Sequence, residues 1–180
     1  MHKPCQTDKT LKKMLEFNKM DNLKNRFYTA SITSFFAFVT IGVLSFLTLN
    51  TDFGWLLAGS FGATMVLVFG FPENPFAQPK NVFFGHFVTT LAGILVLKYF
   101  SIPEYLLIPI AVGVGIFFMI FFDVVHPPAG GNPIVVVLGQ EPFGFLLYPI
   151  VFGSIIILFL AILINRYLLK KKYPLNESSY

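Results

Sequence analysis

The sequence predicts an all-α polytopic membrane protein built from two repeats of a long helix, a short re-entrant or broken element, and a second long helix. Of its 180 residues, 55% are hydrophobic and only 12% are charged, whereas a soluble domain has about 25% charged residues. Between Phe27 and Asn165 the only basic residues are Lys80 and Lys98. So little charge cannot cover a water-facing surface, so we predict one transmembrane domain over residues 27–165.

The remaining basic residues lie at the two ends of the chain, seven of them in residues 1–26 and four in residues 166–172. The positive-inside rule accounts for this pattern and for the net charge of +4 without a nucleic-acid partner. We therefore expect two cytoplasmic tails, residues 1–26 and 166–180, and an even number of crossings. Leu11, Met14 and Leu15 have helical spacing among lysines, which is typical of an amphipathic helix on a lipid surface, and a solvated tail fits equally well.

Four apolar runs are long enough to be spanning helices, since about 20 residues at 1.5 Å per residue cross a bilayer core. These runs are Phe27–Leu49, Val82–Leu97, Tyr105–Phe122 and Phe143–Ile164. No signal-peptide layout precedes the first run, so we expect a multi-pass protein of the cell inner (plasma) membrane with both termini cytoplasmic. The single cysteine, Cys5, cannot form an intramolecular bridge.

Two further apolar segments are interrupted or short. Residues 53–71 carry no charge but contain four glycines, so this segment either spans the membrane or enters it and turns back. Residues 72–81 contain three prolines and are predicted to form a loop. The second segment begins with Asp123 and the run His126-Pro127-Pro128-Ala129-Gly130-Gly131-Asn132-Pro133, and only six apolar residues follow before Gly139. That length is too short to span alone.

The two interrupted segments resemble each other and predict an internal repeat. Gly62–Gly70 and Gly131–Gly139 each begin and end with glycine around a short apolar core, and a Pro/Glu turn and a long apolar run follow each. If the short elements cross, the chain has six spans in two inverted threes; if they re-enter, it has four spans in two parallel repeats. Repeated Gly/Pro-broken segments are the best sequence indication of a transport site near the bilayer midplane.

The starts of the two short elements are the predicted binding site. Prolines are tolerated in a first helical turn, and nearby glycines leave backbone amides approachable, so such a start attracts an anion. The predicted lining residues are Ser60, Gly62, Ala63, Thr64, Gly130, Gly131 and Asn132. Small residues also simply allow helices to approach closely, and we prefer that interpretation for Gly113 and Gly115.

Two histidines lie inside the apolar region, and an ionisable group there indicates function. His86 and His126 would supply hydrogen-bond donors or a proton, and an imidazole with an ordinary pKa of about 6.5 can couple anion movement to protons. A structural link between helices is the alternative for each. Asp123 with both histidines would make only a weak metal site, so no metal or cofactor is predicted. Lys80 and Asn81 would attract an anion at the mouth or anchor lipid headgroups.

Two stretches of the sequence carry specific motifs. The first runs from Gly59 to His86 and contains Phe61-Gly62-Ala63, Pro75-Phe76-Ala77-Gln78-Pro79-Lys80-Asn81-Val82 and Gly85-His86; the second is His126-Pro127-Pro128-Ala129-Gly130. Together these stretches resemble the HPP family of integral membrane proteins. The resemblance covers about Phe27 to Ile164. It implies a compact, four-helix-type membrane protein and, because plant chloroplast relatives are implicated in nitrite transport, a small-anion transporter with nitrite as the leading substrate. Two departures bear on the substrate: Lys80 stands where relatives often have Arg, and Gly131-Asn132-Pro133 differs from the plant type.

We therefore expect a transporter of a small monovalent anion, in a lipid bilayer and as a possible homo-oligomer, and no enzyme, since no catalytic or nucleotide-binding motif occurs. The alternatives are a transporter or channel for another small solute, and a non-transporting membrane module that acts through its basic tail. Removing the tail would abolish the activity of such a module, whereas a transporter would keep it.

Overall fold

The computed structural model describes residues 23–52 and 54–175, and within these residues every regular element is a helix. Four helical stretches are long and apolar enough to cross a membrane, which confirms the four predicted spans. They are α2 (Leu23–Asn50), α4 (Pro79–Tyr99), α5 (Glu104–Phe121) and the stretch Leu146–Leu168, which consists of η4 (Leu146–Val151), α7 (Phe152–Ile162) and η5 (Leu163–Leu168). The predicted tail helix around Leu11 lies outside the described residues.

The loop predicted for residues 72–81 is three residues shorter than expected. It contains the 3-10 turn η2 (Pro75–Ala77), and α4 then begins at Pro79. A proline is accommodated there because the first helical residues have no intrahelical acceptor for their amide groups. Lys80 and Asn81 therefore lie in the first turn of α4 rather than in the loop.

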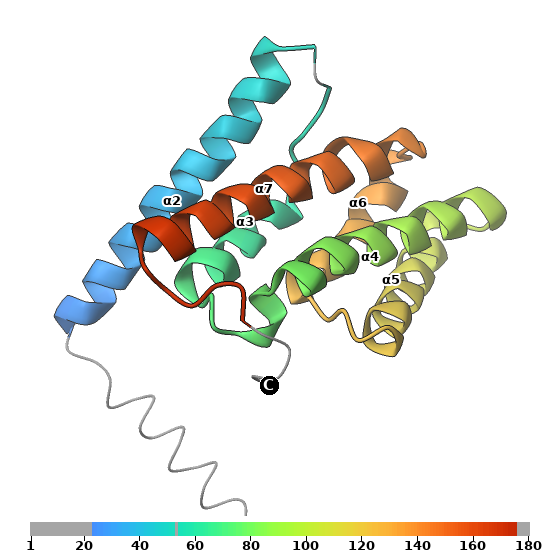
Figure 1. Ribbon diagram of the computed structural model, residues 1–180. Helices are drawn as coiled ribbons and strands as arrows, with labels where there is room; N and C mark the ends of the chain where they lie inside the picture. Colours follow the sequence, from blue (N-terminus) through green and yellow to red (C-terminus); the bar gives the residue numbers. More distant parts are fainter. Residues whose placement is uncertain (1–22, 53, 176–180) are drawn as a thin grey trace, which may run out of the picture.

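Residues 51–70 form a crossing in which the described residues before Ser60 have no regular secondary structure and the second half is helical. After α2 ends, Leu56 N–H donates to Thr48 Oγ1 at 3.0 Å, near the last turn of α2. The segment then forms α3 (Ser60–Met65) and η1 (Val66–Gly70), where Val68 O accepts from Asn165 Nδ2 at 2.9 Å, near the far end of the last long helix. Residues 51–70 thus pass from one end of the bundle to the other (Figure 1).

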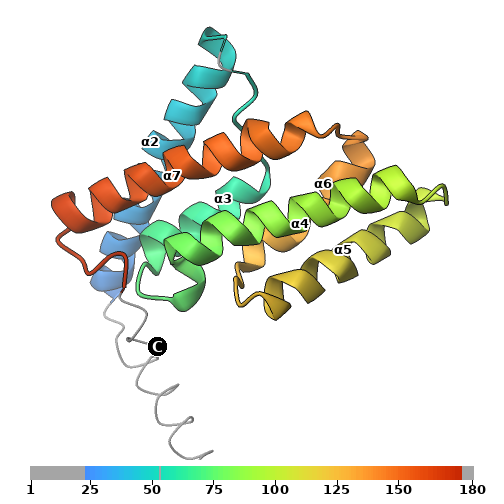
Figure 2. The same cartoon turned by 45° about the vertical axis from the view of Figure 1, so that its right-hand side comes forward.

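We name the two ends by what lies there. The terminal end holds the first residues of α2 and α4 and the last residues of α5 and η5; the distal end holds the opposite ends of these helices (Figures 1 and 2). The second interrupted segment starts at the terminal end, where Asp123 pairs with Lys80 at 3.5 Å between carboxylate and ammonium. It continues through η3 (Pro127–Gly131) and α6 (Asn132–Gly139) to the distal end, where Gln140 Nε2 donates to Glu104 Oε1 at 3.2 Å.

The two interrupted segments consequently run in opposite directions. Residues 51–70 lead from the distal to the terminal end, and residues 122–139 lead from the terminal to the distal end. These opposite directions correspond to the order of two inverted threes, with four stretches long enough to span a membrane and two shorter helical segments between them. Such an inverted repeat is a common architecture of membrane transporters.

The hydrophobic core lies where α3 and η1 pack between α2, α4 and the last long helix. Its largest fully buried side chains include Phe61, Phe69 and Leu56. Gly153 of α7 permits this packing, because a Cβ there would lie 2.7 Å from Phe61 Cε2 and 2.8 Å from Leu56 O. Close contacts of this kind hold helices together in lipid, where burial of apolar side chains supplies little driving force.

The beginning of the predicted C-terminal tail is packed against the bundle. Tyr173 is buried, and its hydroxyl donates to Ala77 O at 2.8 Å. Leu175 N–H donates to Gln78 Oε1 at 2.8 Å. Burial raises the pKa of the Tyr173 phenol above its ordinary value, because the phenolate loses its hydration. Residues 173–175 therefore form a strap across the loop before α4.

Candidate functional site

Four buried polar side chains meet inside the bundle, and we call them the polar cluster. They are Thr64 of α3, His86 of α4, His126 immediately before η3, and Asn132, the first residue of α6. Each is at most 2% exposed. The sequence predicted all four as site residues, and the structure brings them together from two repeats.

The cluster forms because α4 carries a glycine beside the second interrupted segment. A Cβ at Gly85 would lie 2.7 Å from His126 Cβ and 2.9 Å from Val124 O, so any larger residue would push residues 124–126 away from the helix. With glycine there, the ring centroids of His86 and His126 are 4.9 Å apart. Gly85 thus positions both imidazoles although it contributes no side chain.

The hydrogen bonds of Asn132 favour one tautomer of His86. Asn132 Nδ2 lies 3.0 Å from His86 Nδ1, 3.3 Å from His86 O and 2.9 Å from Thr90 Oγ1. A backbone carbonyl only accepts, so we assign the amide nitrogen to this side, where its two protons are shared among these acceptors, with His86 Nδ1 as one of them. His86 therefore carries its proton on Nε2, which lies 2.9 Å from Thr64 Oγ1 and donates to it.

In His126 the two ring nitrogens have the opposite roles to those in His86: Nδ1 donates and Nε2 accepts. His126 Nδ1 lies 2.7 Å from Phe76 O, so Nδ1 carries the proton and donates to that carbonyl. The unprotonated Nε2 lies 3.0 Å from Thr64 Oγ1 and accepts from this hydroxyl. With both imidazoles neutral, one continuous chain of donors therefore leads from Asn132 through His86, Thr64 and His126 to the Phe76 carbonyl.

The starts of the short helices approach the polar cluster with room beside them. Asn132 begins α6, and the residues before it, Gly130 and Gly131, are half-buried; a Cβ added to either would meet no other atom within 4 Å. In α3, Ser60 lies one turn before Thr64, and its carbonyl lies 3.2 Å from the Thr64 hydroxyl. The Ser60 hydroxyl is buried and has no hydrogen-bond partner among residues 23–52 and 54–175. The glycines here are not packing positions.

Two predicted lining residues lie elsewhere. Gly62 and Ala63 are exposed on the outer face of α3, and the structure does not bring them to the polar cluster. Of the two glycines interpreted as packing residues, Gly115 has Pro133 Cγ 3.3 Å from a Cβ position, whereas Gly113 has nothing within 4 Å. The periodicity of α3 turns its small residues outward because Thr64 and Phe61 occupy the inward face.

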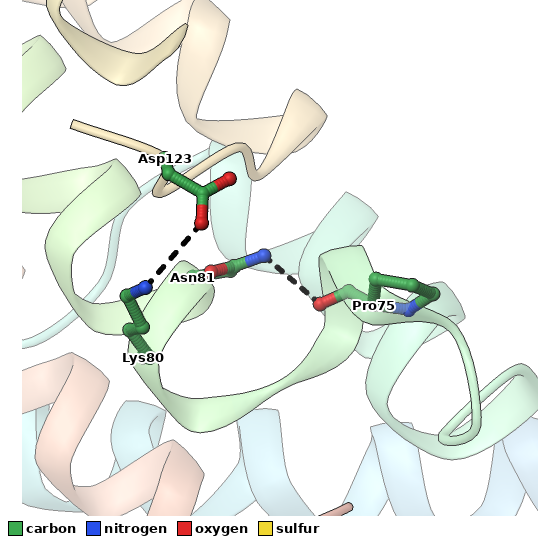
Figure 3. Close-up of polar contacts among 4 residues, drawn as sticks. All are labelled: Pro75, Lys80, Asn81 and Asp123. Atoms are coloured by element: carbon green, nitrogen blue, oxygen red, sulfur yellow. Dashed lines mark hydrogen bonds and ion pairs between the residues drawn. The ribbon is translucent and has the colours of Figure 1, made fainter. Parts of the chain in front are cut away.

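A cavity of about 600 Å³ opens at the terminal end, and we call it the terminal cavity. Lys80, Asn81 and Asp123 line it, together with the strap residues Pro174 and Leu175. In Figure 3, Lys80 reaches toward Asp123, and Asn81 Nδ2 donates to Pro75 O at 3.0 Å. Lys80 and Asn81 are thus separate from the polar cluster and line the terminal cavity.

The terminal cavity and the polar cluster are neighbours. Phe76 and Val125 line the cavity. Phe76 also accepts the hydrogen bond of His126, and Val125 precedes His126 in the chain. Phe76 and Val125 therefore lie between the His126 imidazole and the terminal cavity, which Lys80 and Asp123 also line.

The metal site considered from the sequence does not assemble. The Asp123 side chain is 92% exposed and pairs with Lys80, whereas both histidines are buried. Within the described residues, no group of three or more His, Cys, Asp or Glu side chains is placed to hold a metal ion.

Sequence reasoning missed two threonines that complete the polar cluster. Thr90 Oγ1 accepts from Asn132, and Thr89 Oγ1 donates to Gly85 O at 2.8 Å. Both are fully buried. Their spacing of three and four residues from His86 places them on the same side of α4, and that spacing was the available signal.

These features define a polytopic α-helical membrane protein with inverted repeats and a buried polar centre. The chain belongs to the HPP transmembrane family, because the family model described as "HPP, transmembrane region" matches residues 22–174. Two transmembrane proteins of Dictyostelium discoideum are similar to it: one is 35% identical over 67% of this chain and 45% of its own length, the other 32% identical over 79% and 48%. The chain thus spans about half the length of these relatives. No solved structure matches it.

Proposed function

We propose that this protein transports a small monovalent anion across a membrane, with nitrite as the leading substrate. The observation that carries the proposal is the polar cluster, buried where two inverted, broken crossings meet. Ionisable side chains inside membrane-spanning segments are rare and often mark solute pathways, and two histidines lie in this cluster. Discontinuous helices of inverted repeats place their starts at such sites.

The chemistry of the region suits an anion rather than a cation. No carboxylate belongs to the polar cluster, and the start of α6 brings the positive end of a helix dipole and backbone amides beside Gly130 and Gly131. The open space at these glycines leaves their amides approachable. At the mouth, the Lys80 ammonium lies 3.5 Å from the Asp123 carboxylate, so this pair adds little net charge there.

The test is nitrite uptake into proteoliposomes that contain the full chain. Thr64→Val keeps the side-chain shape but removes the hydroxyl that both imidazoles contact, and leaving buried polar groups unpaired costs about 1–3 kcal/mol each. We expect uptake to fall about tenfold or more. Thr40→Val is the matched control, because the Thr40 hydroxyl is buried and has no partner within the described part of the chain. Uptake that is absent in the unmodified protein, or unchanged by Thr64→Val, would contradict the proposal.

The same vesicles separate the alternatives. A neutral solute or a divalent cation that is taken up in place of nitrite would indicate another substrate. A chain that lacks residues 1–22 should keep its nitrite uptake, whereas loss of all activity on this deletion would indicate a docking module. The proposal includes no catalysis. We also propose that the protein forms a homo-oligomer. The molecular mass of the reconstituted particle tests this.

We further propose that the terminal end faces the cytoplasm of an inner membrane. Cys5 is the only cysteine of the chain and reports on the side of the N-terminus. An impermeant thiol reagent should label Cys5 only after the cells are permeabilised. Labelling in intact cells would place the N-terminus outside.

A further inference from the structure

The two histidines of the polar cluster differ in their ability to take up a proton. Asn132 donates to His86 Nδ1 and His86 donates from Nε2, so a second proton on His86 would point at an amide N–H. A carbonyl, by contrast, accepts from His126 Nδ1, and His126 Nε2 is free to gain a proton. His86 is therefore held neutral, whereas His126 has a place for one more proton.

The Thr64 hydroxyl can adjust to that proton by rotation alone. In the neutral cluster it accepts from His86 Nε2 and donates to His126 Nε2. When His126 Nε2 gains a proton, it becomes a donor, and Thr64 Oγ1 accepts from both imidazoles. The hydroxyl proton then needs another acceptor, and Ser60 O lies 3.2 Å away. Both states of the cluster satisfy every hydrogen bond, and they differ by one proton and one hydroxyl rotation.

We propose that the polar cluster is a proton-binding site in which His126, and not His86, takes up one proton as the anion binds, while the Thr64 hydroxyl turns from His126 to the Ser60 carbonyl. This inference deepens the proposed function and rests on it for the anion. The proton comes from water, adds to the Nε2 lone pair, and breaks no covalent bond in the protein.

The surrounding charges explain why proton and anion bind together. His86 faces His126 from α4 and is neutral; Lys80 and Asp123 neutralise each other at the cavity; Tyr173 hydrogen-bonds to a carbonyl, and Glu73 is exposed. Within the described residues no carboxylate contacts His126, so an imidazolium there has no built-in counter-ion. A buried charge without a partner is costly, and a bound anion removes that cost.

The test is ¹⁵N NMR of the full chain in lipid bilayers with ¹⁵N-labelled histidine, because the two neutral tautomers and the imidazolium give separate signals. The chain has three histidines. His2→Gln removes the one outside the described residues, and His126→Gln assigns the remaining two. Spectra are recorded from about pH 8 to about pH 5, where histidine charge changes occur, with sodium nitrite and with no added anion.

We expect His86 to keep its Nε2 proton throughout, and His126 to change from the Nδ1 tautomer to imidazolium. Nitrite should raise the midpoint of that change by about one pH unit or more, because an adjacent opposite charge favours the charged form. Thr64→Val should suppress the imidazolium because it removes the acceptor, Thr64→Ser should restore it, and Thr40→Val should leave it unchanged.

Imidazolium on His86, or a neutral His126 at every pH with and without nitrite, would overturn the inference. Nitrite uptake by a protein with such spectra would leave the proposed function intact. If the midpoint of His126 protonation does not depend on nitrite, the coupling between proton uptake and anion binding is overturned. If the protein also shows no nitrite uptake, the same result counts against nitrite as the anion.

Discussion

The two interrupted crossings have the same outline but are packed differently. Residues 122–139 press against two helices: Gly93 of α4 has Pro133 Cα 2.9 Å from a Cβ position, and Gly115 of α5 has Pro133 Cγ at 3.3 Å. Residues 51–70 meet Gly153 in this way, and a Cβ at their own Gly54 would lie 3.2 Å from Tyr148 Cδ1, while Gly59 and Gly62 are exposed with nothing within 4 Å. The second crossing is enclosed where Pro133 packs between α4 and α5, and the first is open at Gly59 and Gly62.

The difference corresponds to what each crossing gives to the polar cluster. The enclosed crossing supplies His126 and Asn132, whose ring and amide must be held in one orientation for the donor order to be defined. The open crossing supplies Thr64, whose hydroxyl needs only to rotate. A repeat can thus keep its topology while its two copies take different tasks, because packing density decides which side chains are fixed.

The largest effect is expected at Gly85, which holds the enclosed crossing against α4. In Gly85→Ala the added methyl group would meet His126 Cβ and the Val124 carbonyl, and overpacking against backbone costs about 3 kcal/mol. We expect a marked loss of thermal stability in detergent. Gly62→Ala on the open crossing is the control and should leave the unfolding temperature unchanged. Equal stability of the two variants would remove the distinction between the crossings.

Asn132→Leu should have the next largest effect. It removes the donor to His86 Nδ1 and Thr90 Oγ1, and leaves both buried acceptors unpaired, which costs about 2 kcal/mol in total. The free energy of unfolding in denaturant measures the loss. Asn81→Leu, which removes a hydrogen bond at the terminal cavity, should cost less than half as much. An Asn132→Leu variant as stable as the unmodified protein would show that the amide does not fix His86.

Thr64→Val tests the contribution of the open crossing to stability. Two imidazoles lose their common partner, so we expect a loss of about 1–2 kcal/mol in the free energy of unfolding. Thr40→Val should be neutral or slightly stabilising, because the buried Thr40 hydroxyl has no partner within the described residues. Comparable losses for both variants would mean that the Thr64 hydrogen bonds contribute nothing specific.

The smallest effect concerns the strap outside both crossings. Tyr173→Phe removes the hydrogen bond to Ala77 O and should cost about 1 kcal/mol. Because burial raises the pKa of this phenol above 10.0, its contribution is complete below about pH 10 and declines as the pH rises further. Cleavage of the strap by protease should therefore accelerate at higher pH in the unmodified protein. If Tyr173→Phe shows the same acceleration, the phenol is not its cause.

The sequence predicted best those segments whose structure depends on one physical requirement. Runs of about 20 uncharged apolar residues predict spanning helices because lipid requires internally satisfied backbone, and all four were found. The ends differed by several residues: α2 already includes Leu23, ahead of Phe27, and α4 begins at Pro79 instead of Val82. Polar residues can continue a helix past the apolar run, so hydropathy alone does not locate its end.

The candidate site was predictable in its residue types and only partly in its membership. His86, His126, Thr64 and Asn132 were identified because polar groups in apolar segments are costly. Gly62 and Ala63 were grouped with Thr64 by their position in the chain, but neighbouring residues on a helix point about 100° apart. Proximity in sequence therefore did not predict which of them face inward.

By itself, the sequence determined that this is a membrane protein with four long helices and two similar broken segments, because hydrophobicity and helix-breaking residues act locally. Only the tertiary structure decided that the broken segments run in opposite directions, that Gly85 brings the two histidines together, and that Asn132 and the Phe76 carbonyl give them opposite proton positions. These outcomes depend on contacts between residues far apart in the chain, and such contacts leave no mark on the local pattern.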